Sequence, residues 1–321
     1  MTVQHLMPGQ PPAASEAGAA GFEAWMQAEL RAVESALEVW VPADAPAGLG
    51  EAMRYGVLDG GKRLRPLLVL AACQAVGGSR EAALRASVSV ELIHAYSLVH
   101  DDMPCMDNDV LRRGKPTVHV RYGEAQAMLA GDAMQALAFE VLTPQPGESP
   151  AFEGFCGVEP ALQARLCALL ARSAGHAGMA GGQAIDLASI GMPLDEQALR
   201  DMHRRKTGAL LQASVLMGAA CGPCEPRAWQ ALSDYGAALG LAFQVVDDIL
   251  DVTQESHTLG KTAGKDMHAN KPTYVSVLGL DAARHQAAEL RDRAQDALRR
   301  SGLGGTATLA QLADMVVERE C

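Results

Sequence analysis

The sequence predicts an all-α fold, and three observations support that prediction. Alanine, leucine, methionine, glutamate and glutamine dominate the composition, and these residues favour helices. Runs that alternate β-branched with polar residues, which are typical of strands, are scarce. Apolar residues make up 49% of the chain, which is ample for a helical core. A length of 321 residues allows one large domain or two modest ones.

The chain begins with a stretch that has no pattern of a folded element. Residues 1–20 are rich in proline, alanine and glycine and lack the basic and apolar regions of a signal or transit peptide. We therefore expect a disordered tail over 1–20. Apolar residues then recur at helical spacing over 22–39, which predicts the first helix, and one domain is expected over 21–321.

Two glycines and two cations follow the next helical segment. Gly60 and Gly61 are suited to ending a helix, which leaves Lys62 and Arg65 on the next turn, where they can bind an anion. A nucleotide-binding loop would have Ser or Thr in place of Arg63 and a strand before it, so a nucleotide site is not predicted. As isolated residues, the two cations fit an ordinary surface equally well.

An apolar helix predicted over 88–99 leads into the most informative segment. Three aspartates follow it within seven positions: Asp101, Asp102 and Asp107. Their carboxylates repel one another unless a cation lies between them, and Pro104 should end or kink the helix and spread them around an ion. Mg²⁺ favours such oxygen ligands together with substrate phosphate. Arg112 and Arg113 suit the remaining phosphate oxygens.

The middle of the chain is expected to form walls around this site. Helical spacing predicts a helix over 123–142, and a loop rich in proline and glycine follows over 143–160. Small residues over 175–183 should allow helices to pack closely. Gln183 and Asp186 are three apart and are expected to face the cavity, although Asp186 also fits a cap or a surface position.

An acidic cluster returns about 140 residues after the first one. The apolar residues over 239–250 recur at helical spacing, and Asp247 and Asp251 are four apart, so both carboxylates should project from one helix face. Asp248 lies between them and Gln244 one turn earlier. One such cluster is commonly a solvated face, but two of them without lysine partners indicate a shared metal.

Charge and cysteine content exclude several classes of protein. The net charge is −11, which argues against a protein that binds nucleic acid. No run approaches eighteen apolar residues, so no membrane span is predicted. Seven cysteines form no regular framework, which indicates reduced thiols and a cytoplasmic protein. Cys221 and Cys224 form a CxxC pattern, but they fall between helical segments, where a turn is expected instead of a redox site.

Taken together, these motifs resemble the short-chain polyprenyl diphosphate synthase family, and within it the bacterial farnesyl diphosphate synthases. Residues 101–107 match the family's first aspartate-rich motif, DDxxxxD, and 247–251 match the second, DDxxD. Shorter family motifs occur in the family's order at 60–66, 181–183, 206–208 and 259–261.

The resemblance implies an isoprenoid-synthase-type bundle of about ten or more helices around a deep central cavity. It implies three Mg²⁺ ions held by both acidic motifs: Asp101, Asp102, Asp107, Asp247, Asp248 and Asp251. Lys62, Arg65 and His94 would bind isopentenyl diphosphate. The allylic diphosphate would be bound by five cations: Arg112, Arg113, Lys206, Lys261 and Lys271. Thr207 and Gln244 would direct oxygen dipoles at a developing cation.

The reaction implied is head-to-tail prenyl transfer to farnesyl diphosphate by a homodimer, with catalysis by Asp101, Asp107, Asp247, Lys206, Thr207 and Gln244. Tyr96 and Ser97 would set the product length. The first alternative is a geranylgeranyl diphosphate synthase; a terpene cyclase and a non-catalytic partner subunit are less favoured. Residues 281–321 should form two helices broken at 301–305, and the non-basic end of the chain places a C-terminal contribution to the site in doubt.

Overall fold

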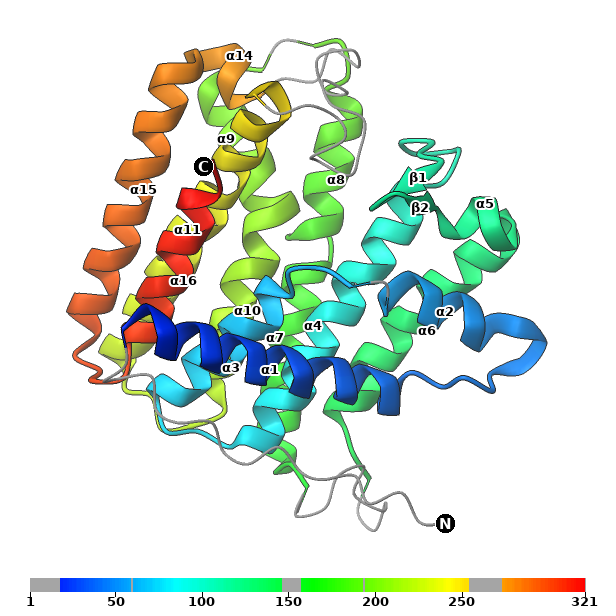
Figure 1. Ribbon diagram of the computed structural model, residues 1–321, viewed down its shortest axis with the longest axis horizontal. Helices are drawn as coiled ribbons and strands as arrows, with labels where there is room; N and C mark the ends of the chain where they lie inside the picture. Colours follow the sequence, from blue (N-terminus) through cyan, green and yellow to red (C-terminus); the bar gives the residue numbers. More distant parts are fainter. Residues whose placement is uncertain (1–17, 59, 146–156, 193, 254–272, 321) are drawn as a thin grey trace.

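The all-α prediction is confirmed by the computed structural model, which describes residues 18–58, 60–145, 157–192, 194–253 and 273–320 (Figure 1). The helices of the first half are α1 (Ala19–Trp40), α2 (Leu49–Val57), α3 (Leu64–Ala75), α4 (Arg80–Asp101), α5 (Val118–Tyr122) and α6 (Glu124–Leu142). Those of the second half are α7 (Pro160–Ala174), α8 (Met179–Ala188), α9 (Glu196–His203), α10 (Ala209–Ala220), α11 (Pro226–Thr253), α14 (Tyr274–Leu278), α15 (Leu280–Ser301) and α16 (Ala307–Val317). A short hairpin pairs β1 (Leu111–Arg112) with β2 (Lys115–Pro116).

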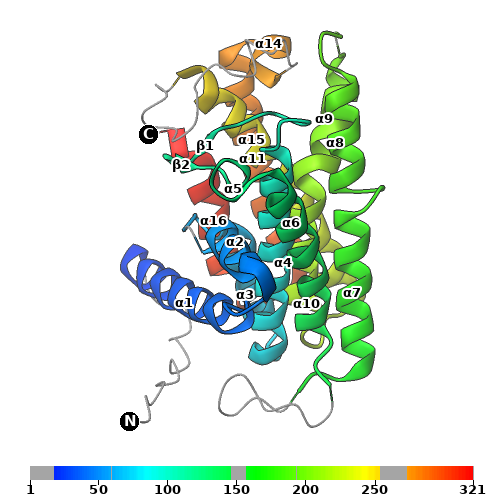
Figure 2. The ribbon, with the colours of Figure 1, turned by 90° about the vertical axis from the view of Figure 1, so that its right-hand side faces the viewer.

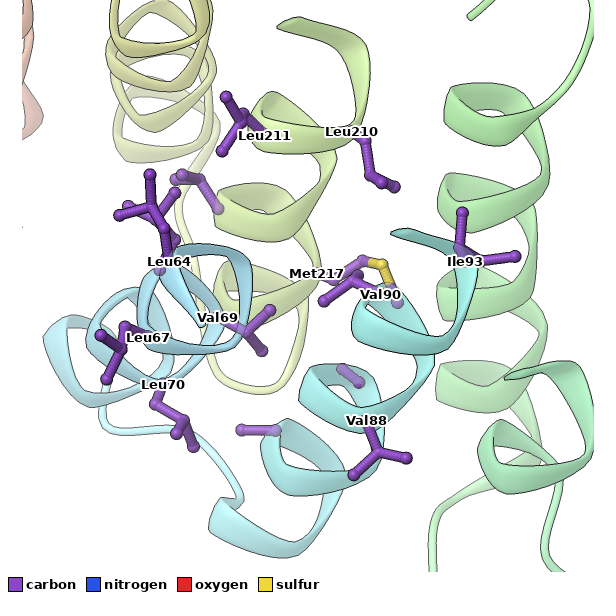
Figure 3. Packing of buried hydrophobic residues seen from close by; sticks show 14 of the residues in the cluster. Leu64, Leu67, Val69, Leu70, Val88, Val90, Ile93, Leu210, Leu211 and Met217 are labelled. Atoms are coloured by element: carbon purple, nitrogen blue, oxygen red, sulfur yellow. The ribbon is translucent and has the colours of Figure 1, made fainter. Parts of the chain in front are cut away.

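The centre of the bundle is built from helices that are buried on all sides. In α4 almost every residue from Glu81 to Ile93 is buried, and α10 is buried over most of its length. Such helices have no solvent face and must be surrounded by others. Figure 3 shows the result, with side chains of α3, α4 and α10 meeting in one apolar cluster. Figure 2 shows α1 on one side of the bundle and α7 with α8 on the opposite side.

Local sequence signals explain several helix ends. α4 begins at Arg80, earlier than expected, because the Ser79 side chain accepts a hydrogen bond from the Ala82 amide at 3.3 Å and caps it. The helix ends at Asp101, before Pro104, as the proline requires. Likewise, the predicted break over 301–305 separates α15 from α16.

The turn that contains Cys221 and Cys224 joins α10 to α11, as expected from the sequence. Among the described residues, no helix has the length and apolar character needed to cross a bilayer. The C-terminal ends of α4 and α11, where the two acidic motifs lie, point to the same end of the bundle (Figure 1).

Candidate active site

A cavity of about 640 Å³ is lined by residues of both α4 and α11. Asp107 of the first acidic motif and Asp247 of the second both line it. So do the three cationic or polar side chains that the sequence singled out for an anion: Lys62, Arg65 and His94. Segments far apart in the sequence therefore place carboxylates and cations around one space.

An apolar pocket of about 380 Å³ adjoins this cavity and shares part of its wall, including Arg65, His94 and Lys206. Its own lining is mostly apolar: Leu98, Met106, Met179, Ala180, Ala184 and Leu187. Tyr96 and Ser97 also line this pocket, and the Tyr96 ring meets the His100 ring edge to face at 5.7 Å between centroids. The site thus combines a cavity lined by charged residues with an adjoining pocket lined by apolar residues.

Asp101, the last residue of α4, lines the apolar pocket, whereas Asp107 and Asp247 line the cavity. Burial raises the pKa of the Asp101 carboxyl to about 6; nearby Asp107 and Asp102 raise it further, and Lys206 opposes them. A carboxylate in this position gains most from a cation that binds beside it. A metal ion bound at the end of α4 would stabilise the ionised form of Asp101, which burial otherwise disfavours. The position of Asp101 is therefore suited to a metal ligand.

Asp102 and Arg112, expected at the metal and at the diphosphate, bind each other in this structure, and Arg112 also lines the cavity. Asp102 is buried and accepts a bidentate pair of bonds from Arg112, at 2.8 Å from Nε to Oδ2 and 2.6 Å from Nη2 to Oδ1. The two charges neutralise each other and tie the hairpin to the end of α4. A metal role for Asp102 and a diphosphate role for Arg112 stay predictions. Arg113 donates a hydrogen bond to the Gly60 carbonyl and ties the hairpin to the loop that carries Lys62.

In the second motif Asp247 and Asp248 both line the cavity, and Asp248 also binds protein groups. Asp248 is 2% exposed and accepts hydrogen bonds from Gln244 Nε2 at 2.8 Å and from the Tyr274 amide at 2.7 Å. Asp251, expected on the same face as Asp247, is buried and lies outside the residues that line the cavity. Asp248 therefore positions Gln244, whose Oε1 accepts a hydrogen bond from Thr207 Oγ1 at 3.0 Å.

Lys206 is held by a residue that the sequence placed near the cavity. Its Nζ lies 2.5 Å from Oδ2 of Asp186, which is buried. The π-helical turn Arg204–Gly208 directs Lys206 and Thr207 into the cavity. Close packing of α8 makes this possible, since a Cβ on Gly182 would lie 2.5 Å from the Lys206 Cα. The small residues over 175–183 therefore act as predicted.

Arg65 is a buried cation with unused hydrogen-bonding capacity. Burial lowers its pKa to about 10, against the opposing effect of Glu91 and Asp247. Its Nε is buried and has no hydrogen-bond partner among the described residues. Burial and the neighbouring arginines also keep the pKa of His94 well below its usual range, so His94 is neutral. A buried guanidinium with a free donor needs an anion, and none of the described protein groups binds its Nε.

One residue missed by the sequence analysis is Arg319. Its guanidinium stacks over the Phe243 ring at 4.3 Å and lines the cavity, although the end of the chain is not basic overall. Burial lowers the pKa of Arg319, and Asp247 opposes that shift. Arg319 therefore reaches the cavity from the C-terminal end of the chain, and a lone arginine between two glutamates gave no signal for this position. Lys261 and Lys271 lie outside the described residues.

The burial of His203 predicts that the stability of the protein depends on pH. The ring stacks on Tyr274 at 5.5 Å, and burial lowers the pKa of His203 from 6.5 to about 4. Below pH 6.5 the unfolded chain binds a proton that the folded protein does not bind, so stability is fully present above pH 6.5 and is lost as the pH falls through 4. The loss is on the order of 3 kcal/mol.

Replacing His203 with phenylalanine keeps the stacking and should remove this part of the pH dependence. The measurement is the urea midpoint at several pH values in the presence of a chelator. An equally steep decline in His203→Phe would show that other groups are responsible.

The residues at the cavity suit a hard divalent cation shared with a phosphate ligand. Asp101, Asp107 and Asp247 present oxygen donors, which Mg²⁺ prefers. Within the described ranges, no three His, Cys, Asp or Glu side chains gather closely enough to hold a metal by themselves. The donor chemistry fits Mg²⁺, and further ligands would come from substrate oxygens.

Comparison with known proteins decides the family. The polyprenyl synthetase family model matches residues 46–302. The chain belongs to the polyprenyl synthetase family. A heterodimeric geranylgeranyl pyrophosphate synthase large subunit of Arabidopsis thaliana is 42% identical over 95% of this chain and 81% of its own. Geranylgeranyl pyrophosphate synthase 9 of the same plant is 44% identical over 93% and 81%.

Solved structures of this polyprenyl synthetase fold agree over nearly the whole chain. An FPP/GFPP synthase from Zymomonas mobilis has a TM-score of 0.81 at 39% identity and covers 94% of this chain and 100% of its own. A geranyltransferase from Helicobacter pylori, complexed with magnesium and isoprenyl diphosphate, has a TM-score of 0.80 at 32% identity, with 94% and 99% covered. The named products differ among these relatives, so family membership does not fix the product length.

Proposed function

We propose that this polyprenyl synthetase condenses isopentenyl diphosphate head to tail with dimethylallyl and geranyl diphosphates, and that farnesyl diphosphate is its main product. The observation that carries the proposal is the single cavity lined by Asp107, Asp247, Lys62 and Arg65. Carboxylates for a metal–diphosphate complex and cations for a second diphosphate lie around the same space, next to an apolar pocket.

Asp101, Asp107 and Asp247 are the residues that would hold Mg²⁺, and the magnesium named in the Helicobacter pylori relative supports this assignment. When bound, the metal neutralises the charge of the allylic diphosphate and makes it a better leaving group. Lys206, fixed by Asp186, lies where it can bind the same diphosphate.

The remaining steps take place between the substrates. The allylic C–O bond breaks, the double bond of isopentenyl diphosphate attacks the allylic cation, and a proton then leaves to the departing diphosphate. Thr207 and Gln244 are hydrogen-bonded to each other and line the cavity, and their oxygen dipoles would stabilise this cation. The apolar wall excludes water, which would otherwise quench the cation.

Product length is proposed to depend on Tyr96. The half-buried ring lines the apolar pocket into which a growing chain would extend, and a bulky side chain there favours a short product. The second candidate product is geranylgeranyl diphosphate, which the names of the plant relatives at 42% and 44% identity favour.

Tyr96→Ala is expected to shift the product distribution to chains longer than that of the unaltered enzyme, because the pocket becomes deeper. The measurement is chromatography of the dephosphorylated prenyl alcohols. Tyr122→Ala is the control, since Tyr122 packs against Tyr55 and does not line the pocket. An unchanged product length in Tyr96→Ala would reject the blocking role.

The function itself is tested by supplying dimethylallyl and isopentenyl diphosphates with Mg²⁺ and sizing the product, with a chelator as control. Product formed from an allylic diphosphate alone would favour a terpene cyclase. No turnover by the purified chain, with turnover restored by a partner, would favour a subunit of a heteromer such as the one named for the Arabidopsis relative. Homodimer assembly and a cytoplasmic location stay predictions.

A further inference from the structure

Arg63 lies between the two cations proposed to bind isopentenyl diphosphate, yet it is itself buried, at 4% exposure. Its backbone is left-handed, with φ of 46°, a conformation that residues other than glycine seldom adopt. Gly60 and Gly61 just before it also have positive φ. This turn sets the direction in which Lys62 and Arg65 leave the backbone.

The Arg63 guanidinium binds three separate elements. Nη1 lies 2.7 Å from Glu91 Oε1 on α4, and Nε lies 2.7 Å from Glu34 Oε1 on α1. Nη2 donates to the Val57 carbonyl at the end of α2, at 2.7 Å. One side chain therefore fixes the 60–65 loop to α1, α2 and α4 together.

The position of Glu91 connects this network to the cavity. Glu91 is 3% exposed, lines the cavity and precedes His94 by three residues on α4, so the two lie about one turn apart. Glu91 and Glu34 neutralise Arg63, whereas Lys62 and Arg65 keep their charge for a ligand. Left unpaired, three cations in four positions would repel one another across the loop.

We propose that Arg63, Glu91 and Glu34 form a positioning unit that holds Lys62, Arg65 and His94 in the geometry that binds isopentenyl diphosphate. This inference rests on the proposed function. None of the three need touch the substrate: Arg63 fixes the loop, and the two carboxylates fix Arg63.

The test is Glu91→Gln, which keeps the shape of the side chain and removes its charge. Charge alone predicts tighter binding of an anion, because a negative group beside Arg65 is lost. A positioning role predicts the opposite: the dissociation constant of isopentenyl diphosphate should rise about 10-fold, since small misplacements of binding groups are costly. Titration calorimetry with isopentenyl diphosphate in EDTA measures this without metal or turnover.

In steady-state kinetics, Glu91→Gln should change the KM values of the two substrates by different factors. KM for isopentenyl diphosphate should rise in Glu91→Gln about as much as the dissociation constant, while KM for dimethylallyl diphosphate should stay within about 2-fold. If Glu91→Gln does not fold, Glu34→Gln replaces it, because that side chain is 37% exposed; the same split is then expected with a smaller amplitude.

A matched control separates positioning from loss of stability. Glu29 is also buried and joins α1 to α4 through two bonds to Arg80, at 2.7 and 2.8 Å, but it does not line the cavity. Glu29→Gln should lower Tm without changing the affinity for isopentenyl diphosphate.

Unchanged or tighter binding by the folded Glu91 variant, or an equal rise in both KM values, would overturn the positioning role even if the unaltered enzyme condenses both substrates. Failure of the unaltered enzyme to turn over, with isopentenyl diphosphate still bound in EDTA, would instead reject the proposed function. Failure to bind isopentenyl diphosphate at all would reject both.

Discussion

Asp247→Asn is expected to lower kcat at least about 10²- to 10³-fold, because an amide cannot supply the negative charge that a metal–diphosphate complex needs. Asp247 is half-buried, lines the cavity and influences the pKa values of three cations around it: Lys62, Arg65 and Arg319. The Asn side chain has nearly the same shape, so the fold should be kept. A higher Mg²⁺ concentration for half-maximal rate should accompany the loss, and a titration of initial rate against Mg²⁺ measures both.

Asp234→Asn is the matched control for this prediction. Asp234 lies on the same helix, α11, and pairs with Arg300 at 3.1 Å on the outer surface. Its removal should leave kcat and the Mg²⁺ requirement unchanged, since exposed ion pairs contribute little. Equal activity of Asp247→Asn and Asp234→Asn would remove the second acidic motif from the mechanism.

Gly182→Ala is expected to lower the free energy of unfolding by roughly 3 kcal/mol or more, since the added carbon meets rigid backbone. The new Cβ would lie 2.5 Å from the Lys206 Cα and 2.8 Å from the Arg205 carbonyl carbon. To relieve this contact, α8 must move away from the turn Arg204–Gly208, which also separates Asp186 from Lys206. Urea unfolding and initial rates, measured on the same preparation, should both decline.

Gly304→Ala provides the comparison for Gly182→Ala. Gly304 is exposed, its φ is not in the left-handed region, and nothing lies within 4 Å of an added Cβ. This variant should be as stable as the parent or slightly more stable, because alanine restricts the unfolded chain. If Gly182→Ala also unfolds like the parent, the packing of α8 against the turn does not position Lys206.

Much of the fold follows from the sequence because apolar spacing determines which helix faces are buried. The predicted helix over 123–142 corresponds to α6 at Glu124–Leu142, and the break over 301–305 separates α15 from α16. The start of α4 was missed because Arg80–Ser87 carries charged and polar residues that are buried through pairing, as with Glu81 and Arg85 at 3.5 Å. Charged residues that are buried in ion pairs do not contribute to the helical spacing of apolar residues, so that spacing does not reveal such a segment.

Only part of the candidate site could be predicted from the sequence, for a related reason. The acidic motifs identify carboxylates, but they do not show which of these face the cavity and which bind protein groups. Asp102 and Asp248 bind partners that the motif spacing does not reveal, Arg112 and the Tyr274 amide, and Asp248 lines the cavity as well. Arg63 and Arg319 depend likewise on long-range contacts, with Glu34 and Phe243. Spacing along one helix carries no information about such partners.

The central claim is that both acidic motifs bind the same diphosphate-bound ions. The most direct measurement is an anomalous difference map from a crystal of the protein soaked with Mn²⁺ and inorganic diphosphate. We expect Mn²⁺ peaks beside one diphosphate, with Asp101 or Asp107 bound on one side and Asp247 on the other. Peaks confined to one motif, or lying on the outer surface away from the cavity, would contradict the account.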